Sequence, residues 1–480
     1  MILLLLAQAQ AVFTGNSACA PCHRAIYDSY QRTAMAQSSG PVESVPAGAF
    51  RHAASGTPYR IDPQGIASGR TFRYFIGSGA AGRSYLHTLD GFLYQAPITW
   101  YSQKARWDMS PGYEQDRDPL WNRPITPSCL YCHASQVRPI YGTDNRYADP
   151  PFLQNGVGCE RCHGPGSEHA AGRAKMVNPA KLPAARRDSV CAQCHLSGEV
   201  RVEKRGRQLA AFRAGDALAD FATYFVIPGG DAGVKATGYV ERFAESRCKQ
   251  ASGDKLWCAS CHDPHAVPAP EQRVAYFREK CLSCHARPHG DKVAGPDCVA
   301  CHMPRARALD GGHGVLTDHG IPKKPGPAVA VSRAWKLEPF LGSGSLRETG
   351  LAYAEVGLRT GSRQQQDEAI RLLSQVPADS AVAVRLGDLL QRQGQLARAE
   401  QLYRTAIGQP PAPLAALVNL GAILGSRGEH DEAIRLWRAA LEKDPGQREA
   451  SVNLARLLRA LGRVDEAARV EHDLHRFDGR

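Results

Sequence analysis

The sequence predicts a mainly α protein in two parts: an irregular domain of short helices with a small β element, followed by an α-helical superhelix. Three patterns in the 480 residues support this. The motif Cys-x-x-Cys-His occurs seven times, two aromatic segments lie between its first two copies, and the C-terminal region repeats every 34 residues. We expect domains at residues 12–319 and 346–480, joined by a Pro- and Gly-rich linker at residues 320–345.

Residues 1–11 have features of a short signal peptide. An apolar run from Ile2 to Leu6 precedes small residues that offer cleavage sites at Ala9 or Ala11. No other stretch approaches 18 consecutive apolar residues, so the sequence predicts no transmembrane helix. We therefore expect an exported protein, periplasmic or extracellular.

The β element is expected between the first two motifs, in the long interval from Cys19 to Cys129. Segments 71–76 and 92–101 are rich in aromatic and β-branched residues, which is typical of strands. Turns between them are marked by Gly77, Gly79, Gly82 and Gly91.

The seven Cys-x-x-Cys-His motifs match the attachment signature of haem c. Each thiol can bond to one vinyl group of the same porphyrin, and the adjacent imidazole reaches the iron as the proximal ligand. Structural zinc sites or redox pairs are the alternative, but a zinc ribbon needs no His directly after its second Cys. The sequence thus predicts seven covalently attached haems, bound by Cys19, Cys22, Cys129, Cys132, Cys159, Cys162, Cys191, Cys194, Cys258, Cys261, Cys281, Cys284, Cys298 and Cys301, with iron ligands His23, His133, His163, His195, His262, His285 and His302.

Only Cys248 lies outside these motifs, so the cysteines do not indicate a disulfide framework. From Cys129 to His302 the motifs are closely spaced and leave little room for a conventional core. We expect short helices to carry them and the porphyrins to supply much of the apolar interior.

The C-terminal region has the 34-residue period of tetratricopeptide repeats, which are helix–turn–helix units. Three positions repeat at this interval: Gly394, Gly428 and Gly462; Ala399, Ala433 and Ala467; Leu386, Leu420 and Leu454. Each unit buries its apolar face only against its neighbours, so we expect a short superhelix. An ordinary helical bundle is the alternative.

The second axial ligand of each iron decides between electron transfer and binding of a small molecule. Seven His lie outside the motifs in residues 1–346 and match the seven haems one for one: His52, His87, His169, His265, His289, His313 and His319. We expect them to be distal ligands. His169 and His265 lie six and three residues after the proximal His of a motif, so each is well placed to reach a neighbouring haem. Rival ligands are Met35, Met109 and Met176.

The formal charge of +12 suggests a nucleic-acid partner. Almost all of the excess lies in residues 1–346, with the haem motifs. Haem propionates are anionic, and buried charges need partners. We therefore expect the basic residues to neutralise propionates and predict no nucleic-acid binding.

The run from Cys162 to His169 and the run from Cys261 to His265 resemble multihaem cytochromes c. That superfamily includes hydroxylamine oxidoreductase, pentahaem nitrite reductase and the tetrahaem electron carrier of ammonia oxidisers. Segments 76–87 and 107–113 resemble its exported branch that carries tetratricopeptide repeats. The resemblance implies closely packed haem pairs, mostly with His on both faces. The Cys-x-x-Cys-Lys motif of the nitrite reductases is absent.

These patterns favour an exported electron-transfer protein whose repeats dock a redox partner or a second copy. The alternative is a reductase or oxidase of a small nitrogen or sulfur oxyanion, which requires one haem with an open face. A scaffold with haem sensors is a third hypothesis.

Overall fold

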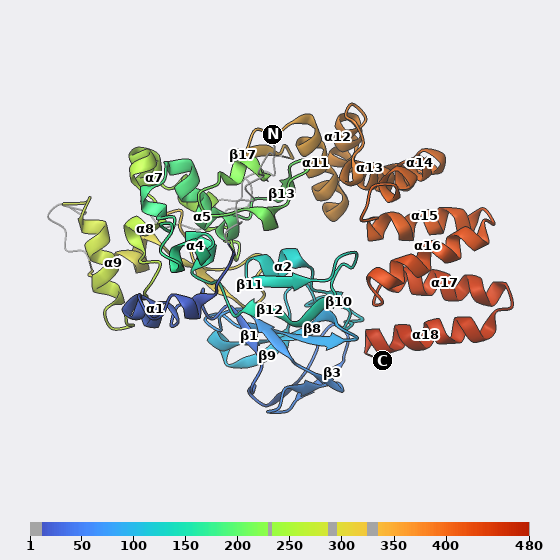
Figure 1. The fold of residues 1–480 in the computed structure, drawn as a ribbon, viewed down its shortest axis with the longest axis horizontal. Helices are drawn as coiled ribbons and strands as arrows, with labels where there is room; N and C mark the ends of the chain where they lie inside the picture. Colours follow the sequence, from blue (N-terminus) through green and yellow to red (C-terminus); the bar gives the residue numbers. More distant parts are fainter. Residues whose placement is uncertain (1–11, 229–232, 287–294, 324–334, 480) are drawn as a thin grey trace, which may run out of the picture.

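The computed structural model describes residues 12–228, 233–286, 295–323 and 335–479. A β region and a group of short helices form the N-terminal part, and helical hairpins form the C-terminal part (Figure 1). This agrees with the predicted fold class. The predicted signal peptide at residues 1–11 lies outside the described residues. No helix that the structure describes is both long enough and apolar enough to cross a membrane.

The β region contains two antiparallel sheets and is larger than the two strands that the sequence indicated. The six-stranded sheet consists of β1 (Ser39–Pro41), β6 (Tyr74–Ile76), β7 (Arg83–Leu89), β8 (Phe92–Tyr101), β10 (Arg123–Pro124) and β9 (Arg106–Met109), which pairs with β8. The four-stranded sheet consists of β2 (Gly48–Arg51), β3 (Pro58–Ile61), β4 (Ile66–Ala67) and β5 (Arg70–Thr71). Aromatic side chains form much of the core of this β region, among them Phe72, Tyr85 and Trp107.

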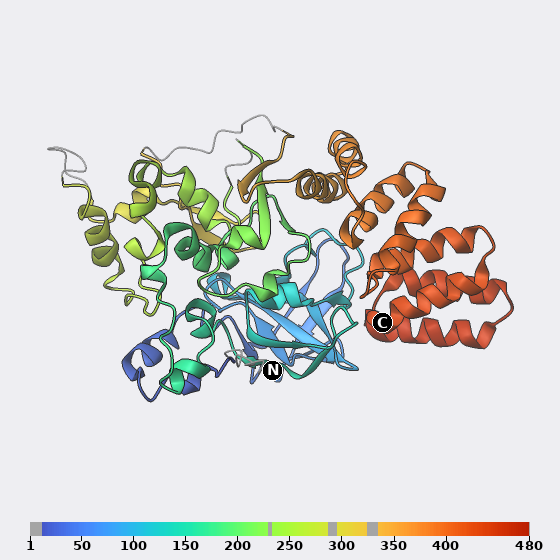
Figure 2. The ribbon, with the colours of Figure 1, turned by 45° about the horizontal axis from the view of Figure 1, so that its top comes forward.

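Short helices carry most of the haem motifs. They are α1 (Arg24–Tyr30), α2 (Pro127–Tyr131), α3 (Glu160–His163), α4 (Ser167–Ala170), α5 (Ala184–His195), α6 (Tyr239–Glu245), α7 (Arg247–Ser252), α8 (Cys258–Cys261), α9 (Arg273–Leu282) and α10 (Cys298–His302). One hairpin lies between α2 and α3 and is formed by β11 (Ser135–Pro139) with β12 (Tyr147–Gln154). A second follows α10 and is formed by β15 (Arg305–Arg307) with β16 (Val315–Thr317). Most of these helices gather on the side away from the repeats (Figure 2).

Four helical hairpins form the C-terminal part. They pair α11 (Leu346–Thr360) with α12 (Arg363–Leu373), α13 (Ser380–Arg392) with α14 (Leu396–Ile407), α15 (Leu414–Ser426) with α16 (His430–Lys443), and α17 (Arg448–Ala460) with α18 (Val464–Asp478). The recurring glycines adopt positive φ angles of 77°, 87° and 75° between paired helices, which explains their period. The recurring alanines are fully buried. The predicted tetratricopeptide architecture is confirmed.

Both ends of the repeat array contact the N-terminal part. At its first end, α11 packs against a sheet of β13 (Val200–Glu203), β14 (Ala222–Val226) and β17 (Glu338–Leu341). Strand β17 comes from the segment predicted as a linker, so part of that segment is ordered structure. Phe225 of β14 is fully buried in the hydrophobic core of the repeats.

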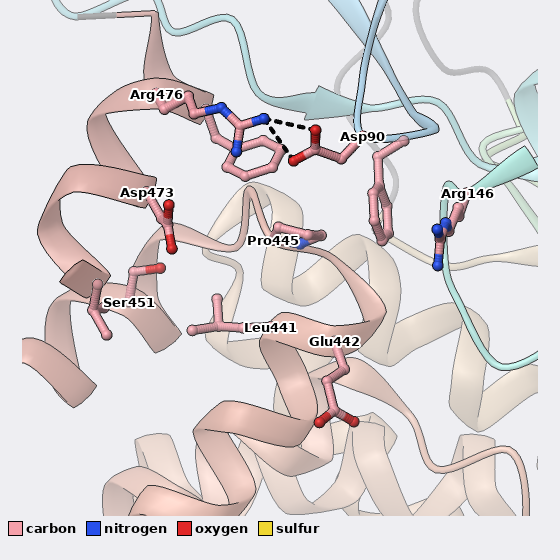
Figure 3. Close-up of a pocket in the computed structure, with 11 residues that line it drawn as sticks. Asp90, Arg146, Leu441, Glu442, Pro445, Ser451, Asp473 and Arg476 are labelled. Atoms are coloured by element: carbon pink, nitrogen blue, oxygen red, sulfur yellow. Dashed lines mark hydrogen bonds and ion pairs between the residues drawn. The ribbon is translucent and has the colours of Figure 1, made fainter. Parts of the chain in front are cut away.

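At its last end, the array contacts β8 and its neighbours. The Tyr94 hydroxyl donates to the Asp444 carboxylate at 2.8 Å, and the Asn122 side chain donates to Asp478 at 2.9 Å. Arg476 pairs with Asp90 at 2.6 Å beside a cavity of about 480 Å³ (Figure 3). We call this contact the C-terminal joint. The chain therefore leaves the N-terminal part at β17 and returns to it at α18 (Figure 1).

Candidate haem-binding site

The haem motifs form single helical turns. In four of them the backbone N–H of the His bonds to the carbonyl of the first Cys at 3.0 to 3.1 Å: His23 with Cys19, His163 with Cys159, His262 with Cys258, and His285 with Cys281. Residues three or four positions apart lie on the same helix face. The two thiols and the imidazole of such a motif are therefore presented to the same side, as haem attachment requires.

Three spare imidazoles lie opposite motif imidazoles. The ring centroids are 6.2 Å apart for His23 and His169, 5.8 Å for His163 and His265, and 6.1 Å for His262 and His319. A metal–imidazole bond is about 2 Å long, and a ring nitrogen lies about 1.1 Å from its centroid, given ring bonds near 1.33 Å. Two imidazoles on opposite sides of one iron thus have centroids about 6.3 Å apart. The observed separations fit this geometry.

Hydrogen bonds orient three of these six imidazoles with Nε2 free to bind iron. Nδ1 lies 2.8 Å from the Val177 carbonyl oxygen in His163, 3.0 Å from that of Ala174 in His169, and 3.0 Å from that of Thr317 in His319. A carbonyl can only accept, so Nδ1 carries the proton and Nε2 keeps its lone pair. Burial also lowers the pKa of His262, His265 and His319, which favours the neutral form that a ligand needs.

Three other predicted distal ligands, His52, His87 and His313, are hydrogen-bonded to residues of the β region. His52 bonds through Nδ1 to Ser55 at 2.8 Å and through Nε2 to the Glu114 carbonyl at 3.1 Å. The Nε2 of His87 lies 2.8 Å from the Trp121 carbonyl. Burial lowers the pKa of His87 to about 4.

His313 Nε2 lies 2.8 Å from Asp108 Oδ2. His52, His87 or His313 could bind iron through Nε2 only if these hydrogen bonds broke. The role of these three residues as distal ligands therefore stays a prediction. The remaining one, His289, lies outside the described residues.

Contacts between ligating residues link the first five motifs to one another, and a sulfur contact links the sixth to the seventh. His163 ends α3 and His169 lies in α4, just after the turn between the two helices. His163 belongs to the third motif, whereas His169 faces His23 of the first motif, so this short segment serves two sites. His262 and His265 link the fifth motif to the third in the same way. Sulfurs of further motifs lie within hydrogen-bonding reach: Cys19 and Cys159, Cys132 and Cys194, Cys191 and Cys258, Cys281 and Cys298.

The interior of this part fits a large apolar prosthetic group. Between Val234 and Ala308, none of the apolar side chains that the structure describes is buried. The buried Nδ1 atoms of His133 and His195 also have no hydrogen-bond partner. All fifteen cysteines are free thiols. A segment of this length without buried apolar side chains needs other apolar surface to pack against, and porphyrins would supply it.

A buried polar contact between three motifs was not predicted from the sequence. It is formed by Tyr131, Arg161 and Gln193. The sequence does hold a signal for this contact. In the second, third and fourth motifs the residue before the second cysteine is large and polar, and in the other four motifs it is not.

Known protein families match separate parts of the chain. Residues 99–164 match the family of cytochrome c554 and c-prime, and residues 250–290 match the doubled CXXCH motif. Residues 384–437 and 426–470 match tetratricopeptide repeats.

The multiheme cytochrome MtrA of Shewanella baltica is 26% identical over 212 residues, which are 41% of this chain and 48% of that protein. The match thus spans about half of the relative's length. Among solved structures, the outer cell wall cytochrome OcwA is 14% identical with a TM-score of 0.43, over 90% of this chain and 99% of that one. MamA is 22% identical with a TM-score of 0.24, over 26% of this chain and 75% of that one.

Proposed function

We propose that this multihaem c-type cytochrome with C-terminal tetratricopeptide repeats carries electrons through seven covalently attached haems outside the cytoplasm. The observation that carries the proposal is the set of three imidazole pairs with centroids 5.8 to 6.2 Å apart. When bound, haem c supplies a reversible one-electron iron centre. His169, His265 and His319 would fill the sixth coordination positions and leave no place for a substrate at these three sites.

Two short segments of the chain each carry two proposed iron ligands, and each segment holds two neighbouring haem sites together. The segment from His163 to His169 serves the first and third sites, and the segment from His262 to His265 serves the fifth and third. Such close and fixed spacing favours electron exchange between sites. The sulfur contacts connect the second motif to the fourth and the fourth to the fifth.

The repeats have two roles in this proposal. Their ends brace the β region against the sheet of β13, β14 and β17, and their remaining surface docks a redox partner protein or a second copy of the chain. Repeat superhelices present extended surfaces that suit such docking.

Reduction or oxidation of a small nitrogen or sulfur oxyanion is the second candidate function. It is favoured by the second and fourth motifs, because neither His133 nor His195 belongs to one of the three imidazole pairs. An iron held there by one His would have an open face.

The test is electron paramagnetic resonance of the mature protein together with its mass. Seven added haems and low-spin signals support the electron carrier, and a high-spin signal supports the second candidate. His169→Ala should convert one haem to high-spin. His472→Ala is the matched comparison, because it removes an exposed imidazole from α18 in the repeats, and it should leave the spectrum unchanged. A mature chain with no added mass and no Soret absorbance would overturn the proposal.

A further inference from the structure

Three of the seven motifs carry a large polar residue directly before the second cysteine. The residue is Tyr131 in the second motif, Arg161 in the third and Gln193 in the fourth. The other four motifs have small residues or proline there: Pro21, Ser260, Ser283 and Ala300. The structure brings the three polar residues together, although they come from three separate helices, α2, α3 and α5.

Their contacts form a closed cycle. The Tyr131 hydroxyl donates to Gln193 Oε1 at 2.9 Å, and Gln193 Nε2 donates to the Arg161 carbonyl at 3.4 Å. Arg161 Nη2 donates to the Tyr131 carbonyl, and the guanidinium carbon lies 3.8 Å from the centre of the Tyr131 ring. Tyr131 is 5% exposed and Gln193 is 2% exposed. Buried polar contacts of this kind fix the relative positions of the segments that they join.

The charged member of the cycle lacks a complete set of partners. Arg161 Nε is buried and has no hydrogen-bond partner. Arg161 is half-buried, and an unpaired buried N–H of a guanidinium favours a nearby anion; a propionate of an attached haem is one that the proposed cofactor supplies.

We propose that Tyr131, Arg161 and Gln193 lock the second, third and fourth haem-attachment loops into one three-way junction, and that Arg161 raises the reduction potential of the haems held there. This inference rests on the proposed electron-transfer function. Reduction adds one negative charge to a haem, so a fixed positive charge nearby favours the reduced form. The junction connects the line of the first, third and fifth sites to the second and fourth sites, and the electron path therefore branches at this point.

The test is a redox titration of the mature Arg161→Gln protein, followed by haem absorbance. Three of the seven one-electron components should move to lower potential, with the ratio of oxidised to reduced haem rising about tenfold at fixed potential, or about 59 mV. The other four should not move. Arg173→Gln is the control, because it removes the same charge from an exposed ion pair with Glu168. No shift in any component, or the same shift in the control, would overturn the inference.

Two further variants separate charge from shape. Arg161→Lys keeps the charge and should leave the three potentials close to those of the original protein; a shift as large as that of Arg161→Gln would refute the electrostatic role. Gln193→Glu places a carboxylate of the same shape beside Arg161 and should lower the same three potentials, which keeps the test available if Arg161→Gln does not mature. The mass and low-spin spectrum of the same samples test the proposed function separately.

Discussion

Replacement of Asp444 by asparagine should stabilise the protein at neutral pH. Asp444 lies in the C-terminal joint, is 3% exposed, and accepts hydrogen bonds from the Tyr94 hydroxyl at 2.8 Å and the Gly446 N–H at 3.0 Å. Burial raises the pKa of its carboxyl from 3.8 to about 6, and the nearby charge of Asp144 adds to this. Asparagine keeps an oxygen that can accept both hydrogen bonds and carries no charge.

The magnitude follows from the shift of that pKa. One unit corresponds to 1.36 kcal/mol, so a shift of about two units corresponds to about 3 kcal/mol. The folded protein holds the Asp444 proton more tightly than the unfolded chain does. This contribution is fully present below about pH 4 and is lost as the pH rises through about 6. The stability gained by Asp444→Asn should therefore be near zero at pH 4 and about 3 kcal/mol at pH 8.

The assay is urea unfolding of the mature protein at pH 4, 6 and 8, followed by circular dichroism. Other titrating groups are common to both proteins and cancel in the difference between them. Glu449→Gln is the control, since it removes an exposed carboxylate from the same part of the array and should change stability by less than about 1 kcal/mol at any pH. A difference for Asp444→Asn that does not depend on pH, or a variant less stable at pH 8, would refute the reasoning.

Three further changes test the repeats and the joint. Trp437 is 3% exposed and packs against Gly421, so Trp437→Ala should cost about 3–5 kcal/mol in urea unfolding; a loss below 1 kcal/mol would contradict the packing. Gly428 has a φ of 87°, so Gly428→Ala should cost about 1 kcal/mol although the space is open, and an unchanged midpoint would refute the strain. Arg476 and Asp90 are 41% and 52% exposed, so a double-mutant cycle should give a coupling of about 0.5 kcal/mol that decreases with salt, whereas a salt-independent coupling above 2 kcal/mol would be inconsistent with a surface ion pair.

The sequence predicted those parts of the structure that depend on local pattern. The helical hairpins follow from the recurring glycines and alanines, because each position makes the same contact in every unit. The haem motifs follow from residue spacing within one helical turn. In both cases, the positions of residues close together in the sequence are sufficient to predict the local structure.

Long-range contacts could not be predicted in this way. The position of His169 just after a motif distinguished it from His52 in the sequence, but it did not identify the partner of either residue. His169 faces His23, whereas His52 is bonded to Ser55 and Glu114. The contacts of His52 depend on the packing of the β region, which brings the Glu114 carbonyl to the His52 imidazole. Strand β17 was hidden for a similar reason, because its partner β14 lies more than a hundred residues earlier.

Attachment at both ends restricts how the repeat array can vary. Solenoids elsewhere gain or lose whole units with little penalty, because each unit touches only its neighbours. In this protein, Phe225 packs into the core at the first end of the repeat array, and Tyr94 is hydrogen-bonded to Asp444 near its last end. Duplication or deletion of one 34-residue unit would carry the last helix away from β8, so the count of units is expected to be held constant over evolution in chains that keep this closed arrangement.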